Sequence, residues 1–179
     1  MRALVVYESM FGNTKAVAVA IAEGVGTHLA VDAIEVGEAP MTLPPDVGLL
    51  VVGGPTHAHG MTSAKSRADA AQRAGDRLVS RAIGMREWLE RLDRPAGSLP
   101  AAAFDTRIKG PELLWGSAAK GAAKRLKDLG FRLLEPPQSF VVGGPAGEMF
   151  DRLPAGELER ARAWGGSLAA ALASHPVTR

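Results

Sequence analysis

The chain has 179 residues, of which 46% are hydrophobic, so it is long enough for one domain with a single buried core. It contains no cysteine, which excludes disulfides, thiolate nucleophiles and sulfur-ligated metals and fits a reducing compartment. The net charge is only +2. No apolar run is long enough to span a membrane, and the first one, residues 3–7, is too short for a secretory signal. We therefore expect a single cytoplasmic domain over residues 1–179 with no membrane partner.

Short apolar runs and helical patterns alternate along the first third of the chain. Residues 3–7 are rich in β-formers and end at turn residues, which is typical of a strand buried on both faces. The helix after it is expected to start at Thr14 and to end near Gly24. Residues 31–36 and 48–53 are predicted as the second and third strands, and the third is the most hydrophobic.

Positive charge is concentrated in the segment that follows the third strand. The segment has five basic residues and only two acidic ones. The basic residues are Lys65, Arg67, Arg73, Arg77 and Arg81, and the acidic ones are Asp69 and Asp76. Residues 63–81 are poorly periodic, so we expect an insertion that is partly helical or mobile and adds little to the core. Because aromatic residues are few and no nucleic-acid motif accompanies the charge, we interpret the segment as solvated and expect no nucleic-acid partner.

The second half of the chain continues the alternation. Its predicted elements are a helix over residues 83–92, a strand over 100–104, a helix capped by Ser117, a strand over 131–142 and a helix over 154–173. Pro136 and Pro137 interrupt the last strand, which should lie at a sheet edge because proline cannot donate to a ladder. The pattern predicts an α/β fold with a doubly wound, five-stranded parallel sheet.

The turn between the first strand and the first helix has the chemistry of a phosphate site. It consists of Ser9, Met10, Phe11, Gly12, Asn13 and Thr14. The hydroxyls of Ser9 and Thr14 can donate to phosphate oxygens, Gly12 lets the backbone come close, and a helix N-terminus offers free amides. The alternative is an ordinary polar turn in which Ser9 and Thr14 only cap the helix. Neither a Walker lysine loop nor a dinucleotide loop is present, which disfavours ATP and NAD.

With this turn placed after an apolar strand, the chain resembles the flavodoxin family. The pattern Ser-Met-Phe-Gly-Asn-Thr is similar to the family's phosphate loop, Ser/Thr-x-Thr/aromatic-Gly-x-Thr, and the order of strands and helices resembles the family across nearly the whole chain. The resemblance implies strand order 2-1-3-4-5 and FMN as cofactor, with its phosphate on residues 9–14.

Two further loops correspond by position to the family's flavin-ring loops. The first would line the isoalloxazine ring with Pro55, Thr56, His57, Ala58, His59 and Gly60. The Gly60 peptide could flip to meet a protonated flavin nitrogen, and the two histidines stand where the family often has an aromatic residue. They lack a further ligand for a metal, so we expect none, and a plain polar-loop role is the alternative.

The second ring loop follows the fourth predicted strand. The resemblance makes Asp105 one of the cofactor-binding residues of this loop and would place Thr106 and Arg107 near the ribityl chain or the pyrimidine edge, and Trp115 over the flavin. Trp115 is equally compatible with a role in core packing.

The resemblance implies an FMN-binding redox protein that transfers electrons to partner proteins. The first alternative is an FMN-dependent reductase acting on NAD(P)H and quinones, and the second is a flavodoxin-like binding module with weak or no flavin. Carriers of this fold are usually strongly acidic and this chain is not, which keeps the reductase interpretation open. The sequence leaves open whether the protein is a monomer or a homo-oligomer.

Overall fold

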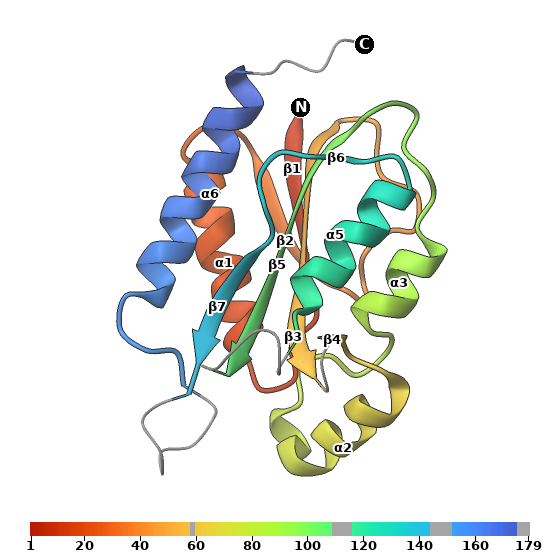
Figure 1. Cartoon of the computed structure of the whole chain (residues 1–179), viewed down its shortest axis with the longest axis vertical. Coiled ribbons are helices and arrows are strands. Elements are labelled where there is room, and N and C mark those ends of the chain that lie inside the picture. The colour runs from red at the N-terminus through yellow and green to blue at the C-terminus, as the bar shows by residue number, and fades with distance from the viewer. Residues whose placement is uncertain (58–59, 109–115, 144–151, 175–179) are drawn as a thin grey trace.

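The protein is seen in a computed structural model that describes residues 1–57, 60–108, 116–143 and 152–174. A central sheet lies between two helical layers (Figure 1), with α1 (Asn13–Gly26) and α6 (Glu157–Ser174) on one face and α3 (Met85–Arg91) and α5 (Ala118–Asp128) on the other. A further helix, α2 (Ala64–Ala74), followed by the short turn η1 (Gly75–Arg77), lies beyond one end of the sheet. None of the helices that the structure describes is long and apolar enough to cross a membrane.

The strand order confirms the predicted topology. The main strands are β2 (Val31–Glu35), β1 (Arg2–Tyr7), β3 (Val47–His57) and β5 (Pro100–Ile108), which pair in this order and in parallel. The predicted fifth strand is present as two pieces, β6 (Arg132–Leu133) and β7 (Gln138–Val142), and both pair with β5. Pro136 and Pro137 lie between the two pieces, because neither can donate to the ladder.

Two strands extend further than predicted, and the extension builds the end of the sheet. β3 continues to His57 instead of residue 53, and β5 continues to Ile108 instead of residue 104. The two pair as far as Pro55 and Thr106, and β7 pairs with β5 as far as Ile108. Polar residues that look like turn residues in the sequence are therefore strand residues, because neighbouring strands satisfy their backbone groups. A short strand, β4 (Gly60–Met61), folds back antiparallel on the end of β3.

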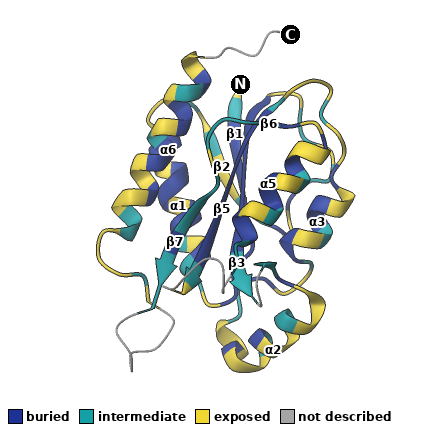
Figure 2. Cartoon of the chain, viewed as in Figure 1, coloured by how far each residue is buried: buried dark blue, intermediate teal, exposed yellow. Residues whose placement is uncertain are grey.

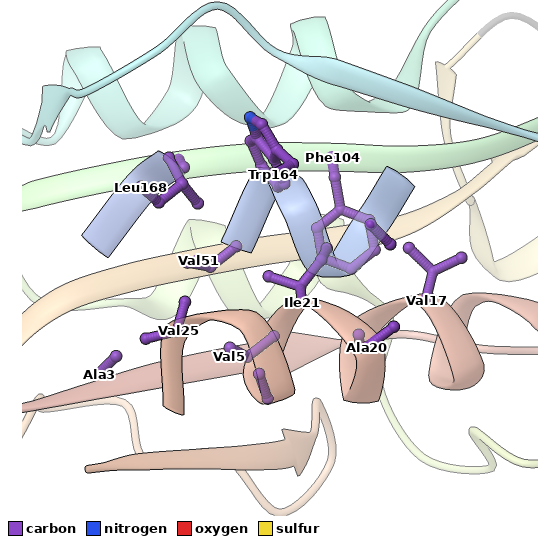
Figure 3. Close-up of a cluster of buried hydrophobic side chains, with 14 of the residues drawn as sticks. Ala3, Val5, Val17, Ala20, Ile21, Val25, Val51, Phe104, Trp164 and Leu168 are labelled. Atoms are coloured by element: carbon purple, nitrogen blue, oxygen red, sulfur yellow. The ribbon is translucent and has the colours of Figure 1, made fainter. Parts of the chain in front are cut away.

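Two hydrophobic clusters fill the spaces between the sheet and its helical layers, and the buried faces of strands and helices point into them (Figure 2). On the α1 and α6 side, Phe104, Phe140 and Trp164 pack edge to face, with ring centroids 6.1 to 6.4 Å apart. Phe104 and Trp164 lie among the aliphatic side chains of α1 and the sheet (Figure 3). On the other side, Trp88 of α3 and Leu126 of α5 are fully buried against the sheet.

Candidate functional site

A cavity of about 430 Å³ opens at the carboxyl ends of β1, β3 and β5, where doubly wound sheets bind ligands. The predicted site residues that line it are Met10, Phe11, Asn13, Thr14, Pro55, Thr56, His57, Thr106 and Arg107. Ser9, Gly12, Gly60 and Asp105 are not part of the lining, and Ala58, His59 and Trp115 lie outside the described residues. The structure thus brings all three predicted loops to one cavity.

The turn of residues 9–14 wraps its backbone around the side chain of Ser9. Ser9 is fully buried, and its Oγ accepts hydrogen bonds from the amides of Gly12 at 3.1 Å and Lys15 at 3.3 Å. The hydroxyl therefore satisfies one amide of the first turn of α1, which is part of the capping role that the sequence left as an alternative. Gly12 has φ +96 at the start of α1, a left-handed conformation that suits glycine.

The start of α1 nevertheless keeps donors for a ligand. The amides of Asn13 and Thr14 find no acceptor among the described residues, and both residues line the cavity. The hydroxyl of Thr14 lies 2.7 Å from that of Thr106 at the end of β5. Free amides at a helix N-terminus beside two hydroxyls form a donor set that suits an anionic oxygen group such as a phosphate.

The end of β3 forms a tight hairpin with β4 rather than an open loop. His57 pairs with Gly60 and Thr56 with Met61 across it. Burial and the nearby positive charge of Arg73 lower the pKa of His57, so its imidazole is neutral at neutral pH. A neutral imidazole can both donate and accept a hydrogen bond at the cavity wall.

Asp105 supports the site from behind. It is fully buried, and its Oδ2 accepts hydrogen bonds from Thr56 Oγ1 at 2.9 Å, Ser117 Oγ at 2.7 Å and the Ala119 amide at 3.0 Å. Ser117 also caps α5, as predicted, by accepting from the Lys120 amide at 3.2 Å. The carboxylate therefore fixes the end of β3 to the start of α5, and the structure places it as a support for the lining residue Thr56.

One face of α2 forms a wall of the cavity that the sequence analysis missed. We call this face the α2 wall. Its residues lie three or four positions apart and therefore on the same side of the helix; they are Ser66, Asp69, Ala70 and Arg73. α2 begins with a reciprocal capping box between Ser63 and Ser66. The capping box and the helical spacing of residues 66, 69, 70 and 73 could have indicated this helix from the sequence. Nothing in an alanine-rich helix with few large apolar residues, however, indicates that it forms part of a site.

The segment that carries α2, residues 62–85, is held at both ends by one buried carboxylate. Glu8, the last residue before the turn of residues 9–14, accepts from Thr62 Oγ1 at 2.6 Å and from the Met85 amide at 2.7 Å. Burial is the largest influence on this carboxyl and raises its pKa, although the two hydrogen bonds and the Arg67 charge act in the opposite direction. Arg67 bridges Thr62 Oγ1 at 3.2 Å and Glu87 Oε1 at 2.8 Å.

The same segment is also bonded directly to the turn of residues 9–14. The Ser80 amide donates to the Ser9 carbonyl at 2.8 Å, and the Ser9 amide donates to Ser80 Oγ at 2.9 Å. Val79 donates to the Met10 carbonyl at 3.2 Å. The α2 wall and the turn are therefore parts of one hydrogen-bonded unit.

The cavity combines a polar end with an apolar one. The free amides and the Thr14 hydroxyl lie at the start of α1, with the Thr106 hydroxyl of β5 beside them. Met10, Pro55 and Ile108 contribute apolar surface to the same space. The residues present therefore fit a ligand that carries a phosphate at one end and a planar ring at the other.

Comparisons with known proteins agree with this geometry. The sequence model of the family described as Flavodoxin matches residues 5–165. No curated protein sequence matches the chain.

One similar structure is a flavodoxin from the domain Archaea, with 20% sequence identity and a TM-score of 0.62; the match covers 95% of this chain and 97% of that one. Another is flavodoxin 1 from Bacillus cereus, with 15% identity and a TM-score of 0.66; the match covers 99% of this chain and 100% of that one. A WrbA-like flavodoxin from Agrobacterium tumefaciens is also similar, with 19% identity and a TM-score of 0.56; the match covers 98% of this chain and 99% of that one. At these identities the structures establish the shared fold.

Proposed function

Because the family model covers most of its length, the chain belongs to the flavodoxin family, and we propose that it binds FMN in the cavity at the carboxyl ends of β1, β3 and β5 and transfers electrons through it. The observation that carries this proposal is the donor set at the start of α1. Two backbone amides without an acceptor among the described residues belong to Asn13 and Thr14, which line the cavity together with Thr106. These groups would hold the FMN phosphate.

The remaining lining residues would hold the flavin ring. Pro55 and His57 at the end of β3 face the cavity from one strand, and Arg107 faces it from β5. When bound, FMN supplies the redox chemistry. The protein positions the ring, excludes water from its buried face and offers the neutral His57 imidazole as a hydrogen-bonding group.

The phosphate site predicts a large difference between FMN and riboflavin, which lacks the phosphate. Several hydrogen bonds to a charged group, at roughly 1.5–3 kcal/mol each, should make FMN bind more tightly than riboflavin by about a hundredfold or more. Titration of the apoprotein with each flavin, followed by flavin fluorescence, measures both dissociation constants.

The matched variant is Thr14→Val, which keeps the shape of the side chain and removes the hydroxyl. It should weaken FMN binding by roughly tenfold and leave riboflavin binding nearly unchanged. Equal affinity of the unmodified protein for the two flavins would rule out the phosphate site and with it the proposed function.

The α2 wall favours an FMN-dependent reductase as a second candidate function. α2 lies beyond the end of the sheet (Figure 1) and lines one side of the cavity. A helix in that position would limit the approach of a protein surface from that side more than the approach of a small molecule. Steady-state oxidation of NADPH by the FMN-loaded protein with a quinone acceptor separates the candidates. Sustained turnover supports the reductase, whereas reduction only by a separate reductase protein supports the carrier.

A further inference from the structure

The charged residues of this protein are unevenly divided among its helices. α2, η1, α3 and α5 together carry ten lysines and arginines but only five aspartates and glutamates. α1 and α6, on the opposite face of the sheet from α3 and α5 (Figure 1), carry three residues of each sign. The first group therefore has a net charge of +5, although the net charge of the whole chain is only +2. We call the outward surface of α2, η1, α3 and α5 the basic face.

The elements of the basic face are bonded to one another. The ion pair described above joins α2 to α3. Arg125 Nε of α5 donates to the Leu89 carbonyl of α3 at 3.3 Å. The guanidinium of Arg86 on α3 donates to the carbonyls of Met61 and Thr62, just before α2, at 2.8 and 3.1 Å. The positive residues are thus carried on one connected and ordered surface, which can position a partner more sharply than charges on untethered loops.

Cations on this face keep their charge available to a partner. Lys120, Lys124 and Lys127 recur at three or four positions on α5, which places them on the same side of the helix, and all three are exposed. Neither Lys124 nor Lys127 makes an ion pair with a residue that the structure describes. Arg86 is also exposed, and its two acceptors above are backbone carbonyls, which do not cancel its charge.

The composition of the basic face favours a protein partner over a lipid surface or a nucleic acid. In the described part of the chain the exposed large apolar side chains are Met1, Phe11, Val19 and Ile108. None of them belongs to the basic face, which therefore offers no apolar side chain to insert into lipid and no aromatic ring on which a base could stack. Glu90 and Asp128 are exposed among the cations. Such a mixture of signs is matched by a protein surface with a negative excess, whereas a phosphate backbone carries only one sign.

The basic face also lies next to the candidate flavin site. α2 lines the cavity, and the start of α5 is bonded through Asp105 to the end of β3. At α2, the thickness of one helix, about 10 Å, separates the outward surface from the cavity. A protein held on this face would therefore lie beside the cofactor site without entering the cavity.

We propose that the basic face docks an acidic protein and that this protein is a one-electron redox partner of the flavin. The docking contact needs no flavin, whereas the partner's redox role rests on the proposed function. Each reduced partner would give one electron to the flavin. Two partner molecules and two protons from solvent then convert oxidised FMN to its fully reduced form, and both partner molecules become oxidised. Positive charge gathered on one side of the protein would steer the acidic partner to this face.

The probes for this contact are two small redox proteins of opposite charge. A plant-type ferredoxin is strongly acidic, and cytochrome c is basic. Calorimetric titration of the whole chain with each probe, with and without FMN, should show ferredoxin binding at about 20 mM salt that weakens by about tenfold or more at about 300 mM salt. Cytochrome c should not bind. Absence of ferredoxin binding at low salt, or equal binding of the two probes, overturns the proposal.

Substitutions on α5 test whether the contact is on the basic face. Lys124→Gln and Lys127→Gln should each weaken ferredoxin binding by roughly two- to threefold, and together by about fivefold or more. Arg162→Gln is the matched control, because Arg162 is an exposed cation on α6 and its loss changes the net charge by the same amount. It should leave ferredoxin binding unchanged. Equal effects of the α5 and α6 substitutions would show that only net charge matters and would overturn the docking surface.

The other anionic partners are tested directly. The protein should neither sediment with vesicles of phosphatidylcholine and phosphatidylserine nor bind a double-stranded DNA oligonucleotide at about 150 mM salt. Binding of either one that is tighter than ferredoxin binding, and that is lost in the variant with both α5 substitutions, would assign the face to that partner and overturn the proposal.

The redox role has a separate readout. In stopped-flow mixing of reduced ferredoxin with the FMN-loaded protein, the second-order rate of flavin reduction should fall with salt and in the variant with both α5 substitutions, but not in Arg162→Gln. A rate that is the same in all three proteins would refute the redox role. Failure to bind FMN would instead refute the proposed function and leave the docking contact in place, so the two failures are distinguishable.

Discussion

Glu8 is a buried carboxyl group that joins parts of the chain far apart in sequence. It accepts hydrogen bonds from Thr62 and from the amide of Met85, with Arg67 and Glu87 close by. An ionised carboxylate in an apolar setting is costly unless it is well paired. Because burial raises the pKa of Glu8, the folded protein binds the proton of this group more tightly than the unfolded chain does.

A pH-dependent stability difference follows from the raised pKa of Glu8. The stabilisation from the protonated group is present below the unfolded-state pKa and is lost as the pH rises through the folded-state pKa. The Glu8→Gln variant has a neutral side chain of the same shape, so its stability does not fall in this way as the pH rises. Urea unfolding of the apoproteins should therefore favour the variant more at high pH than at low pH. A stability difference between the two proteins that does not change with pH would contradict the raised pKa.

Single residues also mark the limit of what the sequence reveals about the site. The turn of residues 9–14 was predictable, because hydroxyl residues and a glycine at a strand-to-helix turn have few other uses together. Asp105 was expected at the flavin, yet it accepts three hydrogen bonds behind Thr56. Two of its donors, Ser117 and Ala119, belong to the start of α5, and no local pattern around Asp105 indicates that contact.

At the scale of elements, α1 and α6 approach each other through a pair of glycines. A Cβ added at Gly165 would collide with the carbonyl oxygen of Ile21, and one added at Gly24 would collide with that of Arg162. The two helices therefore pack backbone to backbone at these points. Their apolar faces meet the aromatic cluster of Phe104, Phe140 and Trp164 there.

Gly165→Ala should lower the free energy of unfolding by about 1–3 kcal/mol, the usual cost of overpacking a fixed contact. The control is the next residue on the same helix, because a Cβ at Gly166 has no atom of another residue within 4 Å. Gly166→Ala should stabilise the protein by up to about 1 kcal/mol through helix propensity. Urea denaturation followed by circular dichroism measures both, and equal effects would show that the helices are not in close contact at Gly165.

The Arg67–Glu87 ion pair joins α2 to α3, so we expect it to limit how easily α2 opens. Glu87→Gln removes the charge that holds Arg67, and it should speed tryptic cleavage after Lys65 and Arg73 by roughly threefold, because local opening becomes less costly by under 1 kcal/mol. A time course analysed by mass spectrometry identifies the cut sites. Glu90→Gln, an exposed acid on α3 with no ion pair to a described residue, is the control. Identical cleavage rates in the two variants would mean that the pair does not hold α2.

The elements that the sequence predicted poorly are those whose form depends on neighbours. β3 and β5 each extend four residues further than expected, because pairs such as Pro55 with Thr106 satisfy backbone groups in polar residues. α2 has few large apolar residues, so periodicity alone gave no reason to place it at the cavity. Helices and strands with a strong apolar pattern, such as β1 and α6, were predicted within a few residues of their bounds.

For the whole molecule, the parallel sheet order could be predicted because alternating strands and helices leave few topologies. The flavodoxin resemblance then selected one of them, and the family model agrees with it. What the sequence did not reveal is that its basic segment, residues 63–81, is built into the edge of the cavity. That placement depends on hydrogen bonds to Glu8 and Ser9, whose partners lie more than fifty residues away.

The closure of residues 62–85 at Glu8 has a consequence for how this fold can diversify. Since both ends of the segment meet at one side chain, residues 63–78 can be lengthened, shortened or replaced without moving β4 and α3, which flank the segment. The entropic cost of such a closed loop grows only slowly with its length. The part of the segment before Val79 is thus an exchangeable module: grafting a different helix between Thr62 and Leu78 would alter which molecules reach the cavity, while the hydrogen bonds of Val79 and Ser80 keep the turn before α1 in place.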